Sequence, residues 1–304
     1  MKPDTALLFS VIIPTYNRPQ TLRQCLRALG NQQLDKTAYE IIVVNDGGEP
    51  LQHLQKNLPD AVTLLLLNQA NAGPAAARNA GAAVARGKYL VFTDDDCAPD
   101  ERWLHHFEHA FFNAPQRTLL GGKTINALPQ NIYASASQLL VDFLYEFHAK
   151  TQSPHTFYTS NNMAISKQNF DSIGGFDQLF PTAAAEDREF SIRWAANNGN
   201  LRFVPKAINF HYHQMTFRKY FRQHFNYGRG ARILYQMLNV KRYKISQQFL
   251  PKSFYMQLFT FPWKSKHAPR LKILALCGLL FVSQFANALG YFYRAGAKST
   301  LPTK

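Results

Sequence analysis

The stretch Lys88-Tyr-Leu-Val-Phe-Thr-Asp-Asp-Asp-Cys97 decides the fold and points to the functional site. Residues 89–93 form a short apolar and β-branched run, which is typical of a strand buried on both faces. Three adjacent carboxylates, Asp94, Asp95 and Asp96, follow at once. Folding alone does not favour them there, because like charges repel and each resists burial. A divalent cation would remove both costs, since hard cations prefer carboxylate oxygen.

The triplet also has an ordinary explanation as an acidic turn, in which Asp96 or Asp100 caps a helix suggested by Asp100-Glu-Arg-Trp-Leu104. The preceding segments favour a ligand site instead. Strand-like and helix-like segments alternate from Phe9 onward, which is typical of a mostly parallel, doubly wound α/β sheet. We expect strands at 9–14, 40–45, 62–67 and 89–93, and helices at 19–29, 51–58 and 71–85.

Polar residues come directly after three of these four strands, on the carboxyl side. The loop Thr15-Tyr-Asn-Arg18 follows the first strand, Asp46-Gly-Gly48 the second, and the carboxylate triplet the fourth. In open α/β sheets, ligands bind in the crevice outside the carboxyl ends of the strands. We therefore expect the three groups to converge on one site.

The charge distribution divides the chain. Net charge is +15, but residues 1–189 hold 15 Lys and Arg and all 19 Asp and Glu, whereas residues 190–304 hold the other 19 Lys and Arg. This asymmetry indicates a polyanionic partner, either nucleic acid or an anionic membrane surface. The three cysteines form no CxxC pair, which favours a reducing compartment without disulfides or a zinc site. Residues 1–9 lack a signal-peptide pattern, so we expect the catalytic part on the cytoplasmic face of a membrane.

Six blocks, in order and at plausible spacing, resemble a family 2 glycosyltransferase of the GT-A fold over roughly residues 9–215. They are Ser10-Val-Ile-Ile-Pro-Thr-Tyr-Asn-Arg18, Glu40-Ile-Ile-Val-Val-Asn-Asp46, Asn71-Ala-Gly-Pro-Ala-Ala-Ala-Arg-Asn79, Phe92-Thr-Asp-Asp-Asp96, Gly174-Gly-Phe-Asp177 and Glu186-Asp187. The resemblance implies a Rossmann-like GT-A domain. Residues 1–97 would bind the nucleotide sugar, and residues 98–215 would bind the acceptor and carry catalysis.

The implied activity is inverting, metal-dependent and non-processive transfer from a nucleotide diphosphate sugar to a hydroxyl of a glycan or lipid-linked acceptor. A UDP-sugar is favoured as the donor. Asp94 and Asp96 resemble the outer pair of the family's Asp-x-Asp motif and would hold Mg²⁺ or Mn²⁺ against the diphosphate. The metal would act as a Lewis acid that neutralises charge on the leaving group.

Further donor contacts are implied around this motif. Asp95 would contact the sugar or ribose, Tyr16 and Asp46 would lie around the base and ribose, and Arg78 would reach the diphosphate. Asp46 has an alternative reading as a turn residue, and Arg78 as a surface salt bridge. The implied donor-binding set is Pro14, Thr15, Tyr16, Arg18, Asp46, Arg78, Asp94 and Asp95.

The resemblance makes Asp187 the general base that deprotonates the acceptor hydroxyl, with Glu186 as its helper. Both also suit the first turn of a helix as ordinary dipole partners. His211 follows a strand expected at 201–210, alternates with His213 onto one face, and is expected as a further metal or diphosphate ligand. Its alternative is a half-buried strand histidine.

The acceptor half is expected around a strand at 157–165 that enters the site. Asn161 and Asn162 are the candidate hydrogen-bonding groups for the acceptor, or else they form a turn. Gly175 and Phe176 are expected at the edge of the sugar pocket, after a tight turn at the two glycines.

Residues 216–304 are expected to form a basic, aromatic and helical extension. Its aromatic side chains interleave with arginines, which suits nucleic-acid stacking or the interface of an anionic bilayer. Residues 273–293 carry no charge and would reach about 31 Å as a helix. That segment can span a bilayer, lie on it or pack on the protein. We expect membrane association and no nucleic acid; a nucleotidyltransferase and a non-catalytic nucleic-acid binder are the rival functions.

Overall fold

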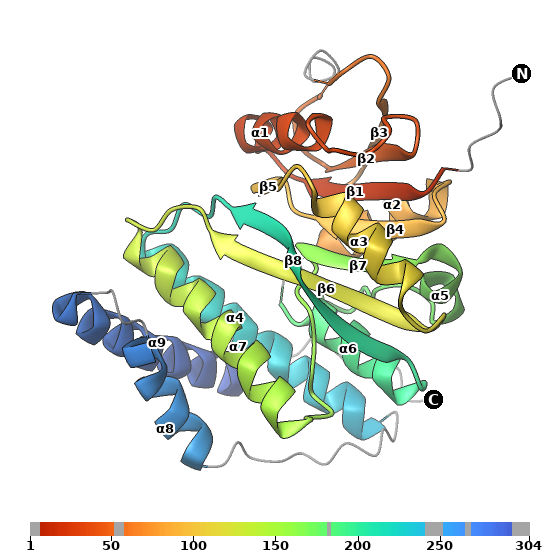
Figure 1. The fold of residues 1–304 in the computed structure, drawn as a ribbon. Coiled ribbons are helices and arrows are strands. Elements are labelled where there is room, and N and C mark those ends of the chain that lie inside the picture. Colours follow the sequence, from red (N-terminus) through yellow and green to blue (C-terminus); the bar gives the residue numbers. More distant parts are fainter. Residues whose placement is uncertain (1–6, 52–57, 181–183, 241–251, 265–268, 294–304) are drawn as a thin grey trace, which may run out of the picture. The chain divides into compact units, whose positions relative to one another are not determined.

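The computed structural model describes residues 7–51, 58–180, 184–240, 252–264 and 269–293. The chain divides into two compact units, Met1–Gln214 and Met215–Lys304, drawn in Figure 1. The expected extension at 216–304 begins one residue after this division. Residues 1–97 and 98–214 belong to the same unit. The helix expected at 51–58 falls largely outside the described residues.

The first unit is built on one mixed sheet with the strand order β3-β2-β1-β4-β7-β6-β8-β5. The first four strands of this order pair in parallel, β7 runs antiparallel to both neighbours, β6 pairs in parallel with β8, and β5 is antiparallel to β8. The strands are β1 Phe9–Thr15, β2 Tyr39–Asp46, β3 Thr63–Gln69, β4 Tyr89–Thr93, β5 Cys97–Pro99, β6 Thr118–Asn126, β7 Asn162–Ser166 and β8 Asn200–His211.

Helices cover both faces of the sheet, because side chains alternate between faces along each strand. Val11 and Ile13 of β1 pack with α1 and α3, whereas Ile12 packs with α2, α5 and α6. A proline lies in the first turn of α1 and of α2. Its fixed φ suits a helix, and the N–H that it lacks would have no partner within the helix at that position. The helices are α1 Pro19–Gly30, α2 Pro74–Val84, α3 Trp103–Phe112, α4 Ile132–Thr151, α5 Lys167–Ser172 and α6 Glu186–Ala196.

Two expected boundaries differ from the structure. The helix expected from Asp100 begins at Trp103, because Asp100 accepts the Arg102 and Trp103 backbone N–H groups in a preceding turn. The strand expected at 157–165 begins only at Asn162, where β7 starts to pair with Thr93 of β4. Residues 157–161 therefore form a loop ahead of the strand.

The second unit contains α7 Phe217–Val240, α8 Lys252–Thr260, the 3₁₀ turn η2 Phe261–Lys264 and α9 Arg270–Phe292. Two glycines let α7 and α9 pack backbone to backbone. A Cβ on Gly228 would overlap the Asn287 carbonyl, and one on Gly290 would overlap the Phe225 carbonyl. Within the described residues, α9 is the one helix long and apolar enough to cross a membrane, with a mean hydropathy of 1.8.

Candidate functional site

The carboxylate triplet lies where β4 ends, beside the loop that follows β1. Asp95 is completely buried, accepts a 2.6 Å hydrogen bond from Thr15 Oγ1 and pairs with Arg18 at 2.9 Å. Burial raises the pKa of Asp95 to about 7, although the Arg18 charge works in the opposite direction. Asp95 thus braces the β1 loop from inside, which does not support the contact with sugar or ribose expected for it.

Asp96 joins the triplet to the end of β8. Its carboxylate lies 2.9 Å from Arg18 Nη1 and 3.3 Å from His211 Nε2. Burial disfavours the charged Asp96, but His211 and Arg18 outweigh it and hold the pKa of Asp96 well below its usual range. Burial likewise opposes a charged His211, and Asp96 outweighs it, so the His211 pKa is raised. Cys97 pairs with His211 in the sheet, which explains why the imidazole reaches the triplet.

These side chains suit a hard divalent cation. Within the described ranges, the group of side chains with metal-ligand spacing is Asp96, Cys97 and His211, whose ligand atoms lie within 4.8 Å of one another. Burial raises the Cys97 pKa strongly, so the neutral thiol is a poor ligand, whereas a carboxylate and an imidazole suit Mg²⁺ or Mn²⁺. Asp94 is not in this group; its Oδ1 faces Arg78.

Arg78, from the first turns of α2, connects the triplet with the start of α6. Its guanidinium lies 2.7 Å from Asp94 Oδ1 and 3.1 Å from Glu186 Oε1. The Arg78 side chain is only 3% exposed, and its carbon Cζ lies 5.8 Å from the centre of the Phe176 ring. The salt bridge considered for Arg78 exists, but it is buried rather than on the surface.

Glu186 and Asp187 are the first two residues of α6, as expected. Burial raises the Glu186 pKa to about 7, and the neighbouring Asp187 charge adds to this rise. Burial also raises the Asp187 pKa, while Arg188 and Arg78 limit the rise. Asp187 accepts hydrogen bonds from the Ser160 and Arg188 backbone N–H groups, which fixes its carboxylate. A carboxylate with a raised pKa is a better general base.

The loops after β1 and β2 supply the other expected donor contacts. Pro14 and Thr15 are buried at the end of β1, and Tyr16 is half exposed, so its ring is available for stacking. Asp46 accepts hydrogen bonds from Gln69 Nε2 and from the Ala72 and Gly73 backbone N–H groups. Three of about four lone-pair sites on this carboxylate are therefore used internally. Asp46 braces the loop that opens α2, and its contact with a base stays a prediction.

The residues expected to bind the acceptor make hydrogen bonds within the protein. Asn162 is completely buried, accepting from Trp103 Nε1 and donating to the Ala207 carbonyl. Asn161 is 9% exposed, and its Oδ1 accepts from two threonine hydroxyls. Both amides were expected from a strand entering the site, but the interior of the sheet needs their hydrogen bonds. Both amides are buried in this structure, and their contact with the acceptor stays a prediction.

Gly175 and Phe176 also make contacts within the protein. Phe176 is 1% exposed and packs on Phe190 in the core, with its backbone held by the Asn79 side-chain amide. The Gly175 carbonyl accepts from Arg193, and its φ of +68° is the left-handed conformation that favours glycine. Phe176 lies beside Arg78, and the place of both residues at the edge of a sugar pocket stays a prediction.

Sequence reasoning missed Asn209 of β8. It is completely buried and donates to Thr93 Oγ1 and to the Asn161 carbonyl, so it fixes the end of β4 just before the triplet. A lone asparagine within an expected strand carries no recognisable signal. The role of Ser160 could not be predicted either. Its backbone N–H donates to Asp187, and any residue except proline supplies such a group.

Comparison with known proteins agrees with this arrangement. Residues 10–225 match the family model described as Glycosyl transferase family 2. The chain is 27% identical over 260 residues to the probable glycosyltransferase YdaM of Bacillus subtilis, covering 78% of this chain and 59% of YdaM. It is 28% identical over 192 residues to a poly(ribitol-phosphate) beta-glucosyltransferase of Bacillus spizizenii, covering 60% of this chain and 28% of that enzyme. The chain thus spans less than two thirds of these curated relatives.

Solved structures show the same fold. A mannosyltransferase from Pyrobaculum calidifontis, in complex with GDP-Man and Mn²⁺, matches with a TM-score of 0.60 at 16% identity over 92% of this chain and 86% of its own. Staphylococcus aureus TarS with UDP-GlcNAc matches with a TM-score of 0.52 at 20% identity over 93% and 89%. The family match covers more than half of the chain and sets aside the nucleotidyltransferase and nucleic-acid-binder alternatives. This chain belongs to glycosyl transferase family 2 and has the GT-A fold.

Proposed function

We propose that this glycosyltransferase moves a sugar from a nucleotide diphosphate sugar to a hydroxyl acceptor in one inverting, metal-dependent and non-processive displacement. The observation that carries the proposal is the buried Arg78 bridge. It places Asp94 of the triplet and Glu186, the neighbour of Asp187, on the two ends of one guanidinium. A donor held at the triplet and an acceptor held at Asp187 would therefore be adjacent.

The chemistry needs a base on one side of the sugar and charge stabilisation on the other. Asp187 takes the proton of the acceptor hydroxyl. The acceptor oxygen bonds to the anomeric carbon of the sugar as the bond from that carbon to the diphosphate breaks. Glu186, with a pKa raised by burial, keeps the local charge low beside the base. Asp96 and His211, with Asp94 nearby, would hold the cation, which supplies Lewis-acid stabilisation of the leaving diphosphate when bound.

The donor class is supported by the neighbours, which were solved with GDP-Man and Mn²⁺ or with UDP-GlcNAc. Tyr16 offers an exposed ring for the base, and Arg18, half exposed beside Asp96, offers a cation for the diphosphate. The acceptor proposal rests on relatives named for polymer synthesis, a poly(ribitol-phosphate) beta-glucosyltransferase and a chondroitin synthase. We propose a glycan, polymer or lipid-linked acceptor for this chain.

Thermal stability measured with UDP-, GDP- and dTDP-sugars, each with and without Mn²⁺, tests the donor site. A ligand at a hundredfold excess over its dissociation constant stabilises the native state by about 2.7 kcal/mol. We expect one nucleotide to raise the melting temperature in a metal-dependent way, and Asp96→Asn to abolish that rise. Asp60→Asn is the matched control, because exposed Asp60 precedes β3 at the opposite edge of the sheet.

The proposal fails if no nucleotide sugar stabilises the wild type with metal present. It also fails if Asp96→Asn keeps the full metal-dependent shift, because the cation would then lie elsewhere. Product analysis by NMR, once an acceptor is found, tests inversion directly: retention of the anomeric configuration would contradict the single displacement.

A further inference from the structure

We propose that α9 lies in the plane of an anionic membrane surface and docks there through one exposed apolar face. This inference goes beyond the proposed reaction. The face, which we call the α9 stripe, is formed by large apolar side chains that are 43% to 80% exposed. They are Leu271, Leu274, Phe281, Phe285, Leu289 and Phe292.

The α9 stripe is apolar, whereas a helix face in contact with water is ordinarily polar or charged. Successive members are three, four or seven residues apart, so they share one side of the helix. The other exposed residues between Leu271 and Phe292 are Ala275, Gly278 and Ala288, so no polar side chain interrupts the stripe. A helix that packs on a protein and faces water places charged or polar residues on its outer face. Contiguous exposed apolar surface of this kind marks an interaction site.

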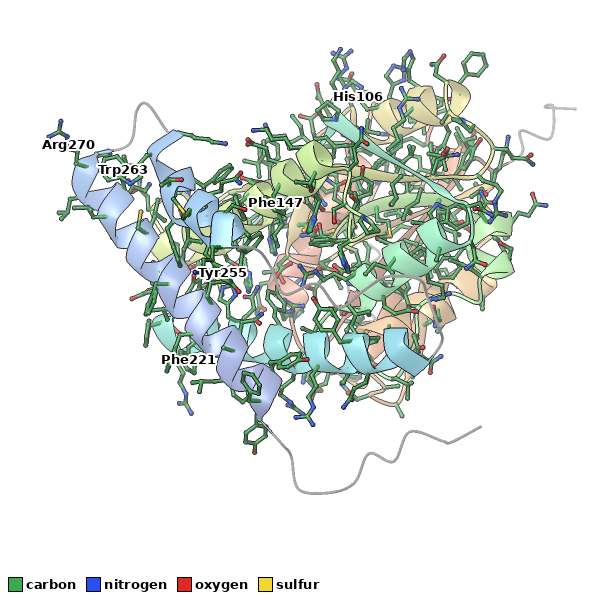
Figure 2. The ribbon with its side chains drawn as sticks, turned by 90° about the horizontal axis from the view of Figure 1, so that it is seen from below. His106, Phe147, Phe221, Tyr255, Trp263 and Arg270 are labelled. Atoms are coloured by element: carbon green, nitrogen blue, oxygen red, sulfur yellow. The ribbon has the colours of Figure 1, made fainter. Side chains whose placement is uncertain are left out.

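The surroundings of the stripe suit a bilayer interface. Tyr255 on α8 and Trp263 in η2 are 39% and 51% exposed, and tyrosine and tryptophan are enriched where a membrane meets water. Figure 2 shows Trp263 and Arg270 near the same end of α9, with Tyr255 on the neighbouring α8. An apolar stripe with a tryptophan and an arginine beside it fits insertion below the headgroups.

Charge complementarity selects an anionic lipid surface. The sequence from residue 190 onward contains 19 Lys and Arg and no Asp or Glu. On α7, Arg218, Lys219, Arg222 and Arg229 are exposed. Each basic residue near an anionic surface favours binding, and nothing acidic in this part of the sequence opposes it. A neutral protein partner would use the stripe but not these charges.

The packing of α7 on α9 favours an in-plane helix over a spanning one. The close glycine contacts at Gly228 and Gly290 and the 2.9 Å hydrogen bond from Tyr220 to the Leu279 carbonyl hold the two helices together. If α9 crossed the bilayer, α7 would cross with it and carry exposed Arg222 and Arg229 into the hydrocarbon, where charges are costly. An in-plane α9 keeps these arginines out of the hydrocarbon.

Flotation of the full chain with vesicles tests the proposal. We expect binding to phosphatidylcholine vesicles that contain phosphatidylglycerol, weaker binding in high salt, and release by alkaline carbonate. The double variant Phe281→Ser/Phe285→Ser should lower the apparent affinity by at least about tenfold. Phe112→Ser is the matched control, because Phe112 is 88% exposed but lies on α3 of the first unit.

Three results would overturn the inference. Absence of vesicle binding, or binding that the double variant leaves unchanged, removes the stripe from the interaction. Resistance to carbonate extraction would indicate a spanning helix. A dimer that the double variant dissociates would show that a second copy covers the stripe instead. Phe281 and Phe285 are both exposed, so substituting them leaves the core intact. The nucleotide-dependent stabilisation of the double variant therefore reports separately on the proposed reaction.

Discussion

Removal of the Arg78 bridge is the sharpest test of how the site is held together. Arg78→Gln would leave the Asp94 and Glu186 carboxylates without their cation. Removing one partner of a buried ion pair costs about 3 to 5 kcal/mol. Two features reduce that cost here. Asp94 is 27% exposed and partly hydrated, and Glu186, with its pKa near 7, can take up a proton. We therefore expect a loss of about 2 to 3 kcal/mol at pH 8.

The pH dependence gives this prediction its sign. The folded pKa of Glu186 lies above its unfolded value, so the protonated form favours the folded state, and this contribution is lost as pH rises through 7. Arg78 lowers the Glu186 pKa, so its removal raises that pKa further. Below pH 5 a neutral Glu186 needs no cation. The stability deficit of Arg78→Gln should therefore be largest at pH 8 and shrink toward pH 5.

Melting followed by circular dichroism between pH 5 and 8, with a chelator present, measures this deficit. For a unit of this size, 1 kcal/mol shifts the melting temperature by roughly 2 to 4 °C, so the deficit at pH 8 should be roughly 4 to 12 °C. Arg23→Gln, an exposed position on α1, should change stability by less than about 0.5 kcal/mol. A deficit that is constant or grows toward pH 5 would refute the role assigned to the Arg78–Glu186 pair.

Three further predictions concern other parts of the chain. Asp187→Asn should lower the rate of sugar transfer about 10²- to 10⁴-fold, while the nucleotide-dependent rise in melting temperature stays. Glu40→Gln should lower the free energy of unfolding in urea at pH 7 by about 2 to 3 kcal/mol. The Glu40 carboxylate is buried at the start of β2 and accepts hydrogen bonds from Ser10 and Arg86. Its pKa is lowered overall: burial raises it, and the bonds from Arg86 and Ser10 outweigh burial. Gly228→Ala should destabilise the α7–α9 pair by about 1 to 3 kcal/mol in limited proteolysis of the second unit.

Each of these has a matched comparison. Transfer by Asp187→Asn within threefold of wild type would exclude the proposed base. The Glu40 contribution is present above pH 4.5 and lost as pH falls through its lower folded pKa, so a Glu40→Gln deficit that grows as pH falls below 4.5 would contradict the ion pair. Gly278→Ala, with open space around it, should stabilise α9 by up to about 1 kcal/mol, and equal effects at Gly228 and Gly278 would contradict the close contact.

The elements that depend on local residues alone could be predicted from the sequence. The apolar runs before Thr15, Asp46 and Asp94 predicted parallel strands, because a strand buried on both faces needs continuous apolar residues. Acidic residues at the ends of such runs predicted a charged crevice on the carboxyl side, and six ordered blocks predicted the family. The strands and the family are confirmed, because each rests on periodicity or on short motifs within single stretches, and the crevice stays a prediction.

Which polar groups hold the protein together depends on the fold and could not be predicted from the sequence. Asp95 and Asp96 are adjacent in sequence, yet their contacts differ. Asp95 is buried and accepts a hydrogen bond from Thr15, whereas Asp96 lies beside His211 at the end of β8. Asn162 reads like a binding residue, but the interior uses both ends of its amide. A buried polar group must find its partners wherever the fold brings them, and partners such as Trp103 lie far away in the sequence. That dependence on distant partners is why the sequence located the carboxylate cluster but not the contacts of each of its residues.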